Sequence, residues 1–175
     1  NFENLKKAEP KWLIGFSDIS TLAMTLLSRL GWASCHSSNL MQMNLAQKDP
    51  STHYVFWYLS SQQFVQESSV YAESALMDWV NNPNDTFKLS HKTQWYSLSQ
   101  SPSESFKGRL IGGCLDTLHL LFFTSYCDFT ALKKRFGSDG IILYLENAEL
   151  TQAQVHRALL TMRMNGMLDG LNGII

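Results

Sequence analysis

The chain has 175 residues, a formal net charge of -1 at pH 7, 45% apolar residues and 17% charged residues. This composition excludes a disordered chain, and the near-neutral charge gives no reason to expect nucleic acid or an anionic membrane as a partner. No apolar run approaches the roughly 18 residues of a membrane span. We therefore expect one ordinary globular domain or two small ones.

The three cysteines, Cys35, Cys114 and Cys127, lack metal-site spacing and cannot all pair with one another. They indicate either a reducing compartment or plain core roles, and we expect a cytoplasmic protein. No secretory signal is visible. The chain starts at Asn1 instead of Met and stops at Ile175 on the apparent start of a buried strand. We therefore expect a piece of a longer polypeptide. Separately, we expect no cofactor and no metal.

The first elements are predicted from apolar spacing. Residues 2–9 favour a helix, residues 11–15 a short apolar strand, and residues 19–30 an amphipathic helix. Gly31 suits the position just beyond the C-terminus of that helix.

Ser17 lies at the corner between this strand and this helix, in the run Gly15-Phe16-Ser17-Asp18. A serine on a strand-turn-helix corner is how α/β hydrolases present a nucleophile, and the helix then points its positive N-terminus at the site. The alternative is a plain helix cap, a role that Ser and Asp both favour. Asp18 replaces the second glycine of the usual elbow, and its backbone N–H would face an oxyanion.

The middle of the chain has less regular patterns. Residues 32–50 are irregular, and the aromatic-rich residues 54–66 are ambiguous between strand and helix. Residues 69–80 fit a helix, and the Ser-, Lys- and Gln-rich residues 86–107 indicate a linker. Within that linker, Trp95 is expected either to stack on a planar ligand or to pack between lobes.

The last third is regular again. Strands are predicted over 109–111 and 141–145, with a helix over 115–125 between them. A further helix begins at Thr151, where Gln154 completes a capping box.

Two features of this last third are candidates for chemistry. Glu146 follows an apolar strand, where α/β sites usually lie, and such a carboxylate can hold a histidine in its working tautomer; the alternative is a solvated strand end. Gly112-Gly113-Cys114 opens a helix, and its N–H groups could cradle an anion. The alternative there is a close backbone crossing that needs small residues. Cys114 as a nucleophile has no implied partner.

A base for Ser17 is not evident from spacing. None of the five histidines has ligand spacing to another histidine or to a cysteine: His36, His53, His91, His119 and His156. We expect His119 and His156 to be packing or surface residues within helices, and the pattern does not single out any of the five as the base.

Four stretches together resemble the LD-carboxypeptidase family of serine peptidases, which includes the microcin C self-immunity peptidases. In the family's order they are residues 10–20, 31–36, 108–115, and 142–147 with the helix and loop that follow as far as Asp169. They span nearly the whole chain. One departure is Ser37-Ser38-Asn39, where the family usually has Gly-Pro, and it changes the turn chemistry after His36.

The resemblance implies a serine carboxypeptidase-type hydrolase that cleaves an amide next to a free carboxylate. By this resemblance Ser17 is the nucleophile, Glu146 orients the catalytic histidine, and the N–H of Asp18 is an oxyanion donor. The catalytic histidine would lie beyond Ile175, and the intact protein would be a homodimer. We also expect Gly113 and Trp95 to contact the substrate.

Two substrate classes fit this activity. One is the murein tetrapeptide, which would lose its terminal D-Ala; the other is a peptidyl or aminoacyl nucleotide of the microcin C type, whose cleavage gives self-immunity. The Gly-Gly-Cys-Leu-Asp segment, the long stretch between Ser17 and Glu146, and Trp95 favour the second slightly. Without its histidine, the Ser17–Glu146 pair of the chain as given is expected to be close to inert, because losing one triad member costs on the order of 10⁴–10⁶ in rate. The alternative is a truncated, non-catalytic relative that only binds its ligand or dimerises, an expectation motivated by the parts of the family protein that this chain lacks at both ends.

The predicted fold is α/β in two lobes. Residues 1–85 form the end of a mostly parallel, three-layer N-terminal domain, and residues 86–107 form a linker. Residues 108–175 form the start of a smaller α/β C-terminal domain.

Overall fold

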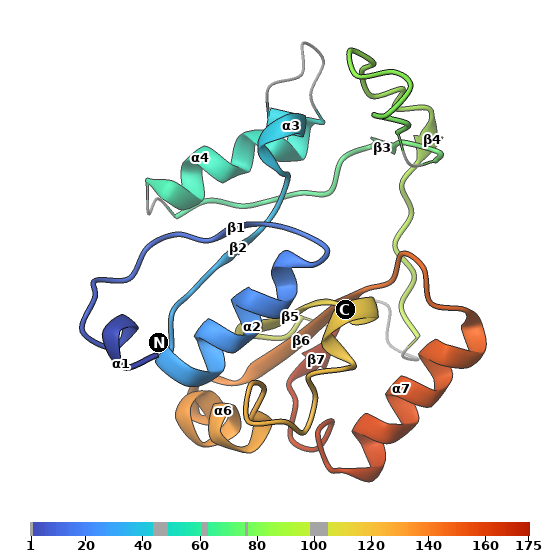
Figure 1. Ribbon diagram of the computed structural model, residues 1–175. Helices are drawn as coiled ribbons and strands as arrows, with labels where there is room; N and C mark the ends of the chain where they lie inside the picture. Colours follow the sequence, from blue (N-terminus) through green and yellow to red (C-terminus); the bar gives the residue numbers. More distant parts are fainter. Residues whose placement is uncertain (1, 44–48, 61–62, 76, 99–104) are drawn as a thin grey trace. The chain divides into compact units, whose positions relative to one another are not determined.

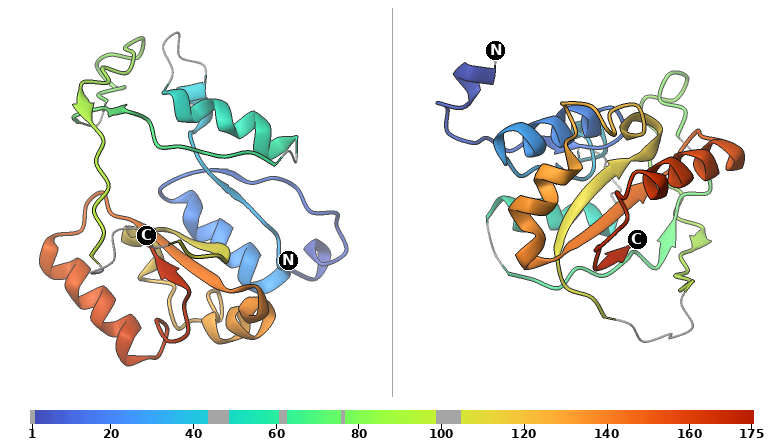
Figure 2. Two further views of the ribbon diagram at one scale, coloured as in Figure 1. Left: turned by 180° about the vertical axis from the view of Figure 1, so that it is seen from behind. Right: turned by 90° about the horizontal axis from the view of Figure 1, so that it is seen from below.

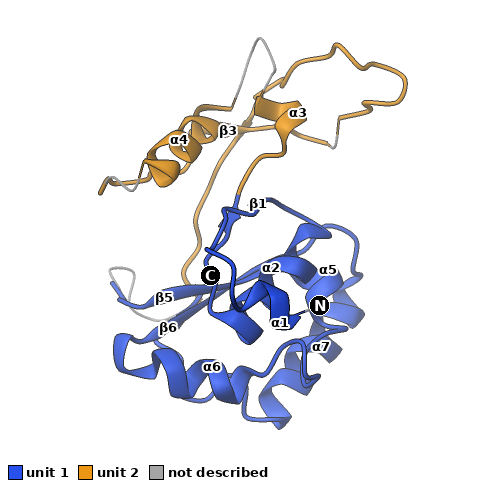
Figure 3. Ribbon diagram, turned by 60° about the vertical axis from the view of Figure 1, so that its left-hand side comes forward, with its two compact units in different colours: residues 1–36, 104–175 blue, residues 37–103 orange. Residues whose placement is uncertain are grey.

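The computed structural model describes residues 2–43, 49–60, 63–75, 77–98 and 105–175. The chain divides into two compact units (Figure 3), which are described separately. Unit 1 combines Asn1–His36 with Glu104–Ile175, and unit 2 is Ser37–Ser103. The predicted division into residues 1–85, 86–107 and 108–175 stays a prediction.

A three-stranded parallel sheet forms the centre of unit 1, in the order β5-β6-β7. The strands are β5 (Arg109–Cys114), β6 (Ile141–Glu146) and β7 (Gly173–Ile174), and they run side by side in the right-hand view of Figure 2. β5 and β6 pair along their whole length, so Cys114 lies opposite Glu146 at the carboxyl end. Ligand sites of α/β sheets usually lie at this end.

A shorter parallel pair precedes the central sheet in sequence. It joins β1 (Ile14–Gly15) to β2 (Cys35–His36), with Gly15 opposite His36. Helix α2 (Ile19–Leu30) connects the two strands, and Gly31 ends it in the left-handed conformation at φ 74°. The predicted helix and its C-terminal glycine are confirmed.

Helices pack against one face of the central sheet. Ile111, Ile141 and Leu143 share that face because they occupy alternate, paired positions on β5 and β6. They form one core cluster with side chains of α2, α5 (Leu115–Leu118), α6 (Phe129–Phe136) and α7 (Gln152–Met164), which lie beside the sheet in Figure 1. The helical members include Met24, Leu118, Leu132 and Met162. The predicted α/β class is confirmed.

Several boundaries in unit 1 differ from the predictions. The first helix is shorter than predicted, since α1 covers Phe2–Leu5, whereas the strand predicted over 141–145 is confirmed and extends to Glu146. The helix that begins after Thr151 with a capping box is confirmed.

The helix predicted over 115–125 is wrong beyond Leu118. Phe123 adopts a left-handed φ of 68°, which an α-helix does not accommodate. Helix α6 was not predicted, although Asp128 caps it by accepting the Ala131 N–H at 2.9 Å. A short 3₁₀ turn, η2 (Gly137–Asp139), follows α6.

Unit 2 contains short elements. They are α3 (Leu40–Met43), the 3₁₀ turn η1 (Pro50–His53), α4 (Tyr54–Leu59) and the antiparallel strands β3 (Tyr71–Ala72) and β4 (His91–Lys92). The ambiguous residues 54–66 thus begin as a helix. The helix predicted over 69–80 is wrong, because Tyr71 pairs with Lys92 and no described residue in that range is helical. Strand pairing has overridden a local helical pattern there.

None of the helices in the described part of the chain is long and apolar enough to cross a membrane.

Candidate active site

Ser17 occupies a strained turn between β1 and α2. Its φ is 57°, a left-handed conformation that costs a non-glycine residue energy and tends to persist at functional sites. The turn is held by the amides of Ile19 and Ser20, which donate to the carbonyls of Phe16 and Ser17 at 3.3 and 2.9 Å. This is the backbone geometry of a strand-to-helix nucleophile corner.

Asp18 follows Ser17 at the N-cap position, directly before the first residue of α2. Its side chain is exposed and makes no capping hydrogen bond, so the plain-cap alternative does not describe this carboxylate. The amides of Ile19, Ser20 and Thr21 bond to carbonyls, whereas the Asp18 amide has no acceptor among the described residues. An amide in this state is able to donate to an oxyanion.

Glu146 ends β6 and contacts His36, which ends β2. Glu146 Oε2 and His36 Nε2 are 3.0 Å apart, although 110 positions separate the two residues in the chain. The histidine side chain is 23% exposed and the glutamate side chain 41%. The hydrogen bond from His36 lowers the pKa of Glu146; burial partly opposes this, while the Cys114 thiol and the Ser17 backbone amide lower the pKa further.

Strand register explains why these groups meet. His36 lies opposite Gly15 in the β1-β2 pair, two positions before Ser17, and Glu146 lies opposite Cys114 in the β5-β6 pair. The Cys114 N–H donates to the buried Ser20 Oγ at 3.0 Å, which ties α2 directly to the end of β5. Unit 1 therefore brings the Ser17 turn, His36 and Glu146 together.

Cys114 and Tyr144 border this group as neutral side chains. Cys114 is 1% exposed, and burial together with the nearby Asp116 carboxylate raises its thiol pKa to about 11. Burial, with the charge of Glu146, raises the pKa of Tyr144 to about 12. A protonated, buried thiol is a poor nucleophile, so the structure does not support Cys114 in that role.

Gly113 is buried, and a Cβ atom there would lie 2.7 Å from Ser20 Oγ. The amide of Cys114, next in the chain, is already bonded to Ser20. These contacts favour the close backbone crossing over an anion cradle at this point. Contact between Gly113 and a substrate stays a prediction.

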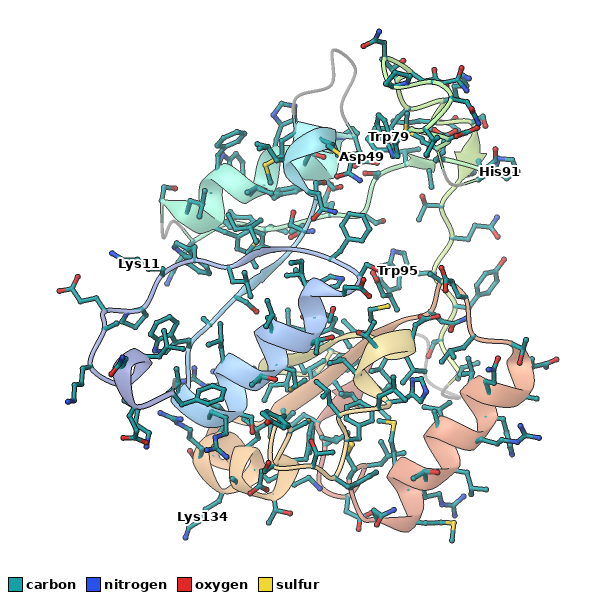
Figure 4. All side chains as sticks on the ribbon, viewed as in Figure 1. Lys11, Asp49, Trp79, His91, Trp95 and Lys134 are labelled. Carbon is teal, nitrogen blue, oxygen red and sulfur yellow. The ribbon has the colours of Figure 1, made fainter. Side chains whose placement is uncertain are left out.

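The remaining candidates do not join Ser17 within unit 1. Trp95 and His91, labelled in Figure 4, belong to unit 2, and Trp95 is 74% exposed. His119 Nδ1 bonds the Leu115 carbonyl at 2.8 Å, and His156 is exposed on α7. In the described ranges no histidine hydrogen-bonds Ser17 Oγ. The base predicted beyond Ile175 stays a prediction.

The contact between His36 and Glu146 is not predicted by the sequence pattern. His36 is one of five histidines that sequence spacing does not single out as a base. Its position in the stretch that resembles the family, just before the unusual Ser37-Ser38-Asn39, was the available signal.

A hollow of about 260 Å³ lies elsewhere in unit 1, between α7 and the segment after α5. It is lined by His119, Phe122 and Phe123 on one side and by residues of α7, including Arg157, on the other. None of the predicted site residues lines it. No group of three or more metal-ligating side chains occurs among the described residues.

Comparison with protein families identifies the class of this chain. The model of the LD-carboxypeptidase N-terminal domain matches residues 1–37, and the model of the LD-carboxypeptidase C-terminal domain matches residues 107–175. The two matches follow the family's order and together cover more than half of the chain. The chain belongs to the LD-carboxypeptidase family of serine peptidases.

Two curated relatives match over nearly the full chain. "Putative carboxypeptidase RP402" of Rickettsia prowazekii (strain Madrid E) is 25% identical over 174 residues, which cover 98% of this chain and 46% of the relative. RC0549 of Rickettsia conorii (strain ATCC VR-613 / Malish 7) matches with the same identity and coverage. The chain thus spans about half the length of the curated relatives that it matches.

Solved structures show the same fold. An MccF-like protein from Bacillus anthracis str. Ames has a TM-score of 0.68 at 21% identity, covering 99% of this chain and 50% of that one. The microcin C7 self immunity protein MccF, in complex with aspartyl sulfamoyl adenosine, has a TM-score of 0.65 at 18% identity with the same coverage. A muramoyltetrapeptide carboxypeptidase from Oxalobacter formigenes has a TM-score of 0.56 at 20% identity, covering 94% and 44%.

Proposed function

We propose that this chain carries the nucleophile and the orienting carboxylate of a serine carboxypeptidase that hydrolyses an amide next to a free carboxylate. The observation that carries the proposal is the left-handed φ of 57° at Ser17, on the β1–α2 corner. The Ser17 backbone amide also lowers the pKa of Glu146, which supports Glu146 as the orienting carboxylate beside this corner. Membership of the LD-carboxypeptidase family supports the same reaction.

Each proposed role follows from chemistry of the acyl-transfer type. Ser17 Oγ attacks the carbonyl carbon while a histidine takes its proton, and Glu146 holds that histidine in the correct tautomer. The Asp18 N–H donates to the developing oxyanion. The histidine then protonates the departing amine, and water hydrolyses the acyl-enzyme. We place this histidine in a segment of the intact protein beyond Ile175, as the resemblance implies.

Two substrate classes remain within the proposal, a murein tetrapeptide and a peptidyl or aminoacyl nucleotide of the microcin C type. Similar folds occur in a muramoyltetrapeptide carboxypeptidase and in MccF, which binds aspartyl sulfamoyl adenosine. Trp95 favours the nucleotide class, because its exposed ring is open to a planar base. Contact between Trp95 and the substrate is part of the proposal.

The test is hydrolysis by the full-length protein, assayed side by side with a muropeptide and an aminoacyl-sulfamoyl adenosine. Ser17→Ala is expected to lower kcat by roughly 10⁴-fold or more, because it removes the nucleophile. The matched control is Ser125→Ala, which changes an exposed serine in the same unit.

A Ser17→Ala variant as active as the wild type would refute the nucleophile assignment. A wild-type protein that binds either substrate without cleaving it would support the non-catalytic alternative. Sedimentation of the same samples tests the predicted homodimer.

A further inference from the structure

We propose that His36 is a positioning residue, whose Nε2–H fixes the Glu146 carboxylate in the orientation that the catalytic histidine of the reaction needs. This inference rests on the proposed function, since it assigns a part in that reaction to a residue outside the Ser–His–Glu set. It is drawn from one contact, Nε2 to Oε2 at 3.0 Å, and from the packing around it.

The position of the imidazole is determined by two contacts. Pairing of β1 with β2 sets the His36 backbone opposite Gly15. The ring then packs edge-on against Tyr144, with centroids 5.4 Å apart and an interplanar angle of 63°. With its side chain 23% exposed, the ring has little freedom to turn away from the carboxylate.

The restrained imidazole of His36 in turn restricts the side chain of Glu146. Its side chain is 41% exposed at the end of a strand, so without a fixed partner it would exchange among solvent-facing rotamers. A catalytic carboxylate must be held closely in place, because small displacements of reacting groups cost large factors in rate. His36 from β2 contacts the carboxylate at 3.0 Å, and the Ser17 backbone amide, from a different segment, also lowers the pKa of Glu146.

The other groups near Glu146 do not replace His36. They are the Cys114 thiol of β5 and the Tyr144 phenol of β6, whose raised pKa values of about 11 and about 12 keep them uncharged near neutral pH. Asp116 faces Cys114 and accepts from its thiol at 3.3 Å. The side-chain hydrogen bond from His36 has the largest effect on the pKa of Glu146.

The first test does not depend on hydrolysis. In full-length protein with ¹³C-labelled glutamate, assigned with Glu146→Gln, the carboxyl pKa of Glu146 is measured by NMR titration. His36→Ala is expected to raise that pKa toward the ordinary value of 4.5, whereas His36→Gln, which keeps a side-chain N–H donor, is expected to raise it less. An unchanged titration in His36→Ala would overturn the inference.

The second test is a double-mutant cycle with Glu146→Gln. His36→Ala is expected to lower kcat roughly 10- to 100-fold with little change in KM, and His36→Gln to restore most of the loss. In the Glu146→Gln background, His36→Ala should add almost nothing, since it acts through Glu146. Thermal unfolding of each variant and the exposed control His156→Ala account for general loss of folding.

The outcomes separate the two proposals. Suppose that the wild type is active and that His36→Ala lowers kcat by the same factor in the wild-type and the Glu146→Gln backgrounds. The proposed function then stands, and the role of His36 is refuted. If the wild type cleaves neither substrate, the proposed function fails, and the NMR titration alone decides whether His36 fixes Glu146.

Discussion

Among single residues, Asp116 shows how a surface carboxylate can shape the site without contacting Ser17. Its two oxygens accept the backbone N–H groups of Ala148, Glu149 and Leu150 at 3.0, 2.7 and 2.9 Å. This loop directly follows Glu146, so Asp116 restrains the chain where β6 ends. Burial raises the pKa of Asp116, but the amide hydrogen bonds outweigh it and lower the pKa to about 2.

Asp116→Ala is expected to lower the free energy of unfolding by roughly 2 kcal/mol, because hydrogen bonds to a charged acceptor are lost. A carboxylate with a lowered pKa stabilises the fold only while ionised. The difference between wild type and variant should therefore be complete above the ordinary Asp pKa of 3.8 and shrink as the pH falls toward about 2.

Urea unfolding followed by circular dichroism over this pH range measures the Asp116 effect. Glu149→Gln, an exposed carboxylate on the same loop, is the control and should change little. A stability difference that does not depend on pH would contradict the ionised-acceptor explanation.

At the level of secondary-structure elements, the β5–β6 contact depends on the absence of a side chain at Gly112. A Cβ atom at this position would overlap the carbonyl group of Tyr144 on the neighbouring strand, and the residue has a φ of +157°. The backbone of β6 cannot move away without losing its pairing with β5, which also determines where Glu146 lies.

Gly112→Ala is expected to lower the free energy of unfolding by roughly 3 kcal/mol, through overpacking and backbone strain. Gly137→Ala is the matched control, since Gly137 has a φ of -60° and nothing lies within 4 Å of its added Cβ. That variant should stay within about 1 kcal/mol of the wild type. Equal unfolding midpoints for the two variants would contradict the packing argument.

For the whole molecule, the segments matched by the two family models fold into one unit, apart from Ser37 at the end of the first match. Met24 of α2 is 1% exposed and belongs to the same core cluster as Ile111 of β5 and Leu143 of β6. Residues 1–36 and 104–175 are therefore expected to unfold as one cooperative body, although unit 2 separates them in the chain.

Met24→Ala is expected to cost roughly 2–5 kcal/mol and to accelerate amide hydrogen exchange in β5 and β6 as much as in α2. Leu22→Ala changes a residue of the same helix that is 56% exposed, and it should leave exchange in the strands unaltered. Faster exchange confined to α2 would show that the two segments are stabilised independently.

The sequence by itself determined the α/β class, helix α2 with Gly31, the capped helix α7, and the placement of Ser17 and Glu146 at element ends. These features rest on local periodicity and local backbone chemistry, which neighbouring residues express directly. Family membership also followed from local motifs, because their order in the chain is itself a sequence property.

The tertiary structure alone decided which distant groups meet. His36 reaches Glu146 only because two separate strand registers and the Ser20–Cys114 hydrogen bond bring residues 110 positions apart into contact. The same reason explains why the helix predicted over 69–80 does not form. Pairing of Tyr71 with Lys92 stabilises a strand there, against the local preference for a helix. Contacts of this kind depend on packing between segments, and no local pattern encodes them.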